Sequence, residues 1–116
     1  GDLEEGGGYR AAAEAFRRYP DTTAIFAAND QTAFGARLYL YEQGLRVPED
    51  VSLVGFDDIA LSAYQIPPLT TVRQPIQDIG IALGRALRAV LAGEVPTLPR
   101  LELRLVERAS VREVRA

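Results

Sequence analysis

The chain has 116 residues, carries a formal net charge of -3 and contains neither cysteine nor histidine. Its length suits about one domain with its own apolar core. Without thiols and imidazoles, disulfides, zinc–thiolate sites and the commonest general base are excluded, which argues against a metal centre, a bound cofactor or nucleophile–base catalysis. The negative net charge argues against direct binding of nucleic acid through phosphate neutralisation.

Membrane and export signals are not evident in the sequence. No apolar run approaches the roughly 20 residues that a membrane-spanning helix needs. The first ten residues, GDLEEGGGYR, are neither basic nor apolar enough for a signal peptide. We therefore expect a soluble, cytoplasmic protein.

The first half of the chain alternates helical and strand patterns. Residues 7–19 place apolar side chains at three- and four-residue spacing, which predicts an amphipathic helix. Residues 24–28 form a short apolar run typical of a buried strand. A second helical pattern follows at 30–43, and residues 51–56 form another buried strand. A strand, a helix and a strand in this order predict two parallel strands in one sheet.

The second half is less regular. Residues 57–64 predict a short helix with an aspartate cap, and residues 69–74 a short strand. Residues 75–92 predict a longer helix, because Pro75 suits a first turn and an apolar stripe follows it. The alternation at 101–108 predicts a final strand.

Glycines mark two places in this pattern. The triple glycine at 6–8 follows no strand and lacks GxGxxG spacing, so we interpret it as a lead-in to the first helix rather than a dinucleotide-binding loop. Gly80 and Gly84 lie inside the predicted long helix, where each lowers helix propensity by roughly 1 kcal/mol relative to alanine. Close packing is the expected reason that they are tolerated.

Polar side chains follow the predicted strands where each strand ends. Asn29 follows the first strand, Asp57 the second, and Gln74 the third. The carboxyl ends of parallel strands meet at one edge of a sheet, where ligand sites gather. A carboxamide beside a carboxylate matches the hydroxyls of a sugar or the edge of a nucleobase. The pattern favours a polyol.

Two other interpretations compete with ligand binding. Asn29 can equally be a turn former or a helix cap. Asp30 and Asp58 are better placed as caps, which leaves Asn29 and Asp57 without an obvious structural task. An acid–base pair of Asp57 with Asp58 is disfavoured, since adjacent residues point in different directions and nothing else supplies a nucleophile. We expect a protein that is not an enzyme.

Three motifs together resemble one protein family. Residues 24–58, AIFAANDQTAFGARLYLYEQGLRVPEDVSLVGFDD, are followed by IPPLTTVRQPIQDIG and later by LRLVERAS. In this order and spacing they resemble the C-terminal third of the effector-binding core of LacI/GalR-type bacterial transcription regulators. The resemblance implies an α/β, periplasmic-binding-protein-like type I fold, here a three-layer parallel-sheet lobe without the first lobe and the DNA-binding headpiece.

The resemblance also implies roles for particular residues. In the family, the asparagine of the AND turn and the first aspartate of GFDD contact the effector, which nominates Asn29 and Asp57. The glutamine of VRQP nominates Gln74 more weakly. The position of Leu3 usually holds an aromatic residue that packs on the effector ring, so here only an apolar contact is expected.

A homodimer is implied as well, with its interface formed by Phe34 and Leu38 together with the segment from Ala63 to Ile66. Exchange of the long helix or the terminal strand between subunits is one way in which such a dimer could cover the apolar stripe. For Phe34 and Leu38, packing in the core of the same chain is the alternative. By resemblance, residues 1–74 form the C-terminal lobe, 75–104 a crossover helix and segment of the N-terminal lobe, and 105–116 the return strand and tail.

The function implied is allosteric and non-catalytic. A sugar or nucleobase-like effector shifts the arrangement of two lobes, and DNA is bound only through the absent headpiece. The alternative is a sugar-binding module of a transport system, which shares the fold. A helix-turn-helix in neighbouring sequence would favour the regulator, and a secretory signal the transporter.

Overall fold

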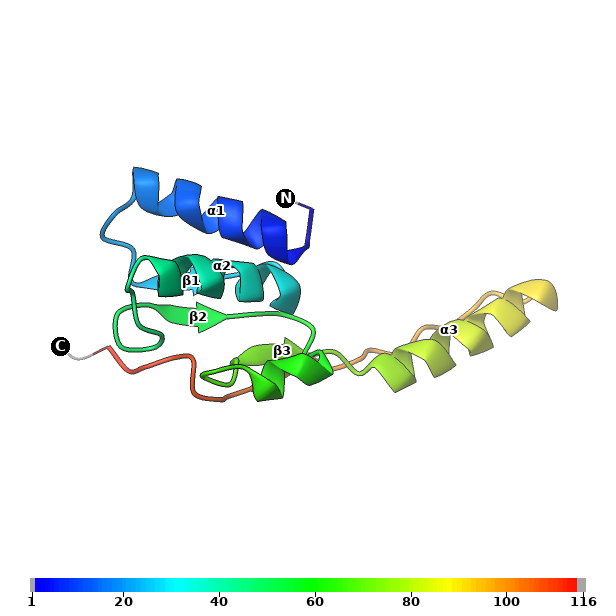
Figure 1. The fold of residues 1–116 in the computed structure, drawn as a ribbon. Coiled ribbons are helices and arrows are strands. Elements are labelled where there is room, and N and C mark those ends of the chain that lie inside the picture. The colour runs from blue at the N-terminus through cyan, green and yellow to red at the C-terminus, as the bar shows by residue number, and fades with distance from the viewer. Residues whose placement is uncertain (1, 115–116) are drawn as a thin grey trace. The chain divides into compact units, whose positions relative to one another are not determined.

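The computed structural model describes residues 2–114 (Figure 1). The chain divides into two compact units. The first consists of the chain up to Arg73 together with the chain from Leu105 onward, and the second of Gln74–Arg104. Within residues 2–114, no helix is both long and apolar enough to cross a lipid bilayer.

Two helices of the first unit pack against each other, α1 (Glu5–Arg18) and α2 (Asp30–Glu42). A side chain on Gly8 would collide with the carbonyl oxygen of Thr32, and one on Gly35 with that of Glu5. The triple glycine therefore lies inside α1, and the prediction of a lead-in was wrong. The helix periodicity does not reveal that Gly8 is needed for this close approach.

Aromatic side chains complete the contact between these helices. The rings of Tyr9 on α1 and Tyr39 on α2 meet edge to face with centroids 5.6 Å apart, and Phe16 lies 6.0 Å from the same Tyr39 ring. Figure 1 shows α1 and α2 stacked beside the strand pair β1–β2. The stacked helices thus form one layer and the strands another.

The parallel pair predicted from the sequence is confirmed. Strand β1 (Ala24–Phe26) pairs in parallel with β2 (Ser52–Val54), with Ala24 opposite Ser52 and Phe26 opposite Val54. Both strands are shorter than predicted. Hydrogen bonds continue past β1, because the amide of Ala27 donates to the carbonyl of Val54 at 2.8 Å.

A second two-stranded sheet joins β3 (Thr71–Arg73) to β4 (Arg104–Val106). The β3 segment runs parallel to the end of β2, through bridges of Val54 with Thr70 and Asp57 with Arg73. The α/β class is thus confirmed, in the form of two small sheets. The predicted final strand at 101–108 is reduced to three residues.

The core of the first unit lies where α1 and α2 meet β2 and the segment before β3. Its members are small or branched apolar residues that are almost fully buried: Ala12, Ala27, Ala33, Ala36, Leu53 and Leu69. Small residues on the helices permit the close packing. Ile25, Phe34, Tyr39 and Val47 are partly buried against this core.

The second unit contains α3 (Ile76–Leu91), which confirms the predicted helix and begins one residue later than predicted, with Pro75 as its N-cap. None of its residues is buried. Gly80 and Gly84 face open space, so the expectation of close packing around them was wrong within this structure. The apolar stripe on α3 is exposed, including Ile76, Leu83, Leu87 and Val90, and Ile81 and Leu91 elsewhere on the helix are exposed as well.

Candidate functional site

Asn29 is the N-cap of α2. Its side-chain oxygen accepts a hydrogen bond from the amide of Thr32 at 2.8 Å, and its Nδ2 donates to the carbonyl of Leu3 at 2.8 Å. The prediction that Asp30 caps this helix was therefore wrong. A carboxamide has two donors and an acceptor with two lone pairs. These two bonds leave Asn29 one donor and one lone pair for a ligand.

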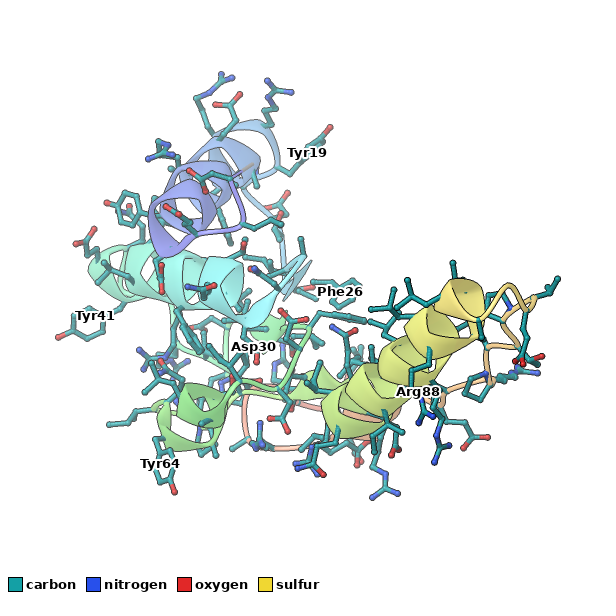
Figure 2. All side chains as sticks on the ribbon, turned by 90° about the vertical axis from the view of Figure 1, so that its right-hand side faces the viewer. Tyr19, Phe26, Asp30, Tyr41, Tyr64 and Arg88 are labelled. Carbon is teal, nitrogen blue, oxygen red and sulfur yellow. The ribbon has the colours of Figure 1, made fainter. Side chains whose placement is uncertain are left out.

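Asp30 is fully buried at the first residue of α2. Its Oδ1 accepts from the hydroxyl of Thr71 at 2.5 Å, and its Oδ2 accepts from the hydroxyl of Ser62 at 2.5 Å and the amide of Ile59 at 2.9 Å. Figure 2 shows Asp30 in the interior of the first unit, between α2 and the segments that carry these donors. Asp30 therefore stabilises contacts between distant parts of the chain.

Asp57 lies at the same edge of the sheet as Asn29. Asn29 comes three residues after Phe26, and Asp57 three residues after Val54, the paired ends of the parallel strands. The two loops are hydrogen-bonded to each other, since the amide of Asp30 donates to the carbonyl of Phe56 at 2.9 Å. The predicted carboxamide and carboxylate are thus brought to one edge.

The backbone turns sharply at this edge. Asp57 has a φ of 122° and Asp58 a φ of 56°, in the left-handed region that residues other than glycine rarely adopt. The 3-10 helix η1 (Ala60–Tyr64) follows, and Ile59 at its N-cap provides no side-chain cap. The predicted aspartate cap of this helix was wrong.

Asp58 instead forms ion pairs. Its side chain is only 6% exposed and contacts Arg73 at 2.6 Å and Arg108 at 2.7 Å. Arg108 also donates to the carbonyl of Leu69 at 2.9 Å. Burial of Asp58 opposes its ionisation, but hydrogen bonds from Arg108 and Arg73 outweigh that effect and lower the pKa of the Asp58 carboxyl below its ordinary value.

This lowered pKa predicts a loss of stability in acid. Asp58 contributes stability above the ordinary carboxyl pKa of about 3.9, and this contribution is lost as the pH falls through its lower folded-state pKa. Urea unfolding of Asp58→Asn between pH 6 and pH 3 should show a weaker dependence on pH than that of the wild type. Glu14→Gln, which breaks exposed pairs with Arg17 and Arg18, is the control and should keep nearly the wild-type dependence. Parallel curves for wild type and Asp58→Asn would contradict the assignment.

Leu3 and Gln74 have different relations to this edge. Leu3 lies beside Asn29 through its carbonyl, has a φ of 60° and keeps an exposed side chain. Gln74 is half-buried and directly follows β3, but it belongs to the second unit. The structure thus brings Leu3, Asn29 and Asp57 together at one edge. For Gln74, the only link to this edge is that it follows the end of β3 in the chain.

Three of the four residues expected at a dimer interface are exposed on the first unit. Leu38 is 50% exposed, Ile66 80% exposed, and Ala63 is also exposed. Phe34, by contrast, packs partly against the core of its own chain. Tyr41 and Tyr64 point outward from the same unit in Figure 2.

An open groove of about 380 Å³ adjoins these side chains. It is lined in part by Arg37, Tyr41, Val47, Ile66 and Pro67. The Nε of Arg37 is buried and makes no hydrogen bond to any residue in the part of the chain that the structure describes. The groove combines apolar walls with a cationic group.

Sequence patterns did not identify the buried hydrogen bonds of Asp30 or the ion pair of Asp58 with Arg108. Ser62 and Thr71 lie 32 and 41 positions from Asp30, and Arg108 lies 50 positions from Asp58. The only local signal was the position of Asp30 at the start of α2, and it favoured a role as helix cap, which was wrong.

The edge shared by Asn29 and Asp57 offers both hydrogen-bond donors and acceptors, which suits recognition of hydroxyl or amide groups in a ligand.

Comparison with known proteins identifies the family of the chain. A model of the periplasmic binding protein-like domain matches residues 1–111. The HTH-type transcriptional repressor PurR of Escherichia coli is 40% identical over 113 residues, which are 96% of this chain and 33% of the repressor. The chain belongs to the periplasmic binding protein-like domain family.

Solved structures place it more narrowly. A transcriptional regulator CelR–cellobiose complex is 39% identical, with a TM-score of 0.87 over 95% of this chain and 34% of that one. The lac repressor dimer bound to operator and the anti-inducer ONPF is 34% identical, with a TM-score of 0.86 over 96% of this chain and 39% of that one. The predicted resemblance to LacI-type regulators is confirmed, and the chain spans about a third of the length of the curated relatives that it matches.

Proposed function

We propose that this chain is the effector-binding and dimerisation portion of a LacI-type transcription regulator that acts without catalysis in the cytoplasm. The observation that carries this proposal is the parallel β1–β2 pairing, which brings the Asn29 and Asp57 loops to one edge. Relatives that match almost the whole chain are named as repressors and regulators, which supports a regulator over a transport module and over an enzyme.

Asp57, Asn29, Leu3 and Gln74 are proposed as effector contacts. Asp57 accepts hydrogen bonds from hydroxyl or N–H groups, the remaining donor of Asn29 binds a ligand oxygen, and Leu3 contributes an apolar surface. A cellobiose complex of one relative supports a sugar, and a nucleobase presents a similar set of donors and acceptors. The effector acts by binding one arrangement of two lobes more tightly than the other.

The proposed organisation is close to the two compact units but assigns Gln74, which lies in the second unit, to the C-terminal lobe. Residues 1–74 belong to the C-terminal lobe, 75–104 to a crossover helix and segment of the N-terminal lobe, and 105–116 to the return strand and tail. We propose that Leu38, Ala63 and Ile66, with a contribution from Phe34, form the interface of a homodimer. DNA is bound through a separate headpiece in the full-length protein.

Calorimetric titration of the full-length protein tests the binding site. Cellobiose, lactose and hypoxanthine serve as probes. For a probe that binds, Asp57→Ala should weaken affinity by about 10-fold to 100-fold, since a charged hydrogen-bond partner contributes about 1.5–3 kcal/mol. Asn29→Asp keeps a good cap for α2 but loses the amide donor to the Leu3 carbonyl and to the proposed ligand, so it should weaken binding at a stability cost of about 0.5–1.5 kcal/mol.

Asp50→Ala is the control, because Asp50 pairs with Arg46 on an exposed loop away from this edge. Unchanged affinity in both Asp57→Ala and Asn29→Asp would refute the assigned site. Binding of none of the three probes would exclude cellobiose, lactose and hypoxanthine as the effector.

A further inference from the structure

We propose that Asp30 is a positioning residue that holds the loops of Asn29 and Asp57 at a fixed separation. The importance of Asp30 for effector binding rests on the proposed function. No side-chain contact between Asp30 and a ligand is required. Asp30 is fully buried, and it acts by holding in position the loops that carry Asn29 and Asp57.

The carboxylate of Asp30 is bound on both oxygens. Thr71 from β3 donates to Oδ1, while Ser62 from η1 and the amide of Ile59 donate to Oδ2, with distances of 2.5–2.9 Å. All three donors are uncharged groups. A buried carboxylate depends on its hydrogen bonds, because their loss leaves a desolvated charge without compensation.

The same residue is joined to both candidate ligand loops. Along the chain, Asp30 follows Asn29, and its donor Ile59 comes two residues after Asp57. On the other side of Asp57, the carbonyl of Phe56 accepts from the Asp30 amide at 2.9 Å. The segment that carries Asp57 is therefore held to Asp30 both before and after that residue.

Two further features suit a charged aspartate at this position. The first turn of α2 favours negative charge, because its backbone N–H groups point toward the helix start. Gly55 is also packed so closely that a side chain there would collide with the Oδ1 of Asp30. The surroundings thus leave little room for the carboxylate to move.

Hydrogen exchange measured by mass spectrometry on the full-length protein tests this role without any ligand. Asp30→Asn replaces one acceptor oxygen by a donor. It should raise exchange by about 10-fold or more in peptides covering residues 29–33 and 57–62. Val51→Ala, a buried substitution outside these hydrogen bonds, is the control for a general loss of stability.

A milder pair of variants covers the case in which Asp30→Asn does not fold. Thr71→Val removes one donor to Asp30, and Thr71→Ser retains it. Faster exchange in both segments for Thr71→Val, with recovery in Thr71→Ser, supports the proposal. Exchange in Asp30→Asn or Thr71→Val that rises no more than in Val51→Ala overturns it.

Titration with cellobiose, lactose and hypoxanthine then distinguishes a failure of the Asp30 role from a failure of the proposed effector site. Where the wild type binds a probe, Asp30→Asn should weaken that binding by about 10-fold or more relative to Val51→Ala. Equal affinities in the two variants would overturn the positioning role. If the wild type binds no probe, none of the three compounds is the effector, and the exchange result alone decides the role of Asp30.

Discussion

Gly35→Ala is expected to lower the free energy of unfolding of the first unit by about 3 kcal/mol, at the upper end of the usual cost of overpacking. The added methyl group would collide with the carbonyl oxygen of Glu5 and lie against the amide of Tyr9. Both groups belong to the backbone of α1, so no side-chain rotation relieves the contact. Urea unfolding followed by the near-ultraviolet circular dichroism of Tyr9 and Tyr39 reports on this helix pair.

Gly80→Ala is the matched control for that experiment. Gly80 also lies inside a helix, but nothing is found within 4 Å of the position where its side chain would begin. The substitution should raise the helical stability of α3 by up to about 1 kcal/mol. Equal effects of Gly35→Ala and Gly80→Ala would show that helix propensity, and not the close approach of α1 and α2, determines the outcome.

The exposed stripe on α3 leads to the second large expected effect. We expect the 116-residue chain to self-associate through this stripe, because large apolar side chains along a helix are stabilised when they leave water. Leu83 and Leu87 lie one turn apart on the same face. Their joint replacement by glutamate should lower the association constant by at least about 100-fold, since each buried leucine contributes about 1.5–3 kcal/mol.

Sedimentation velocity over a range of concentrations measures this change. Arg88→Glu is the control, since it alters charge on α3 and keeps the leucines. Circular dichroism of each variant establishes that α3 is still helical. A wild-type chain that stays monomeric throughout the concentration range with α3 folded would contradict the prediction.

The types and order of the elements could be predicted because local patterns determine them. The parallel strands, the start of α3 after Pro75 and the edge shared by Asn29 and Asp57 all follow from periodicity and chain order. Strand lengths were overestimated at 101–108. The alternation of apolar and polar residues indicates which residues suit a strand. The number of residues that form a strand also depends on the segment with which they can pair.

The roles of individual polar residues could not be predicted in the same way. Local sequence favoured Asp30 as the cap of α2, but Asp30 is bound by Ser62 and Thr71, which are distant in the chain, and Asn29 is the cap. Gly8 likewise has a low helix propensity, and its presence in α1 is explained only by the close contact of α2 at Thr32. Local rules fail here because long-range contacts determine these positions.

The most direct test of the account is a crystal structure of the full-length protein with a bound probe identified by the titrations. We expect an oxygen of Asp57 to accept a hydrogen bond from the ligand at about 2.5–3.2 Å and Asn29 to contact the same molecule. A ligand bound without contact to either residue would contradict the central claim that this edge of the sheet is the effector site.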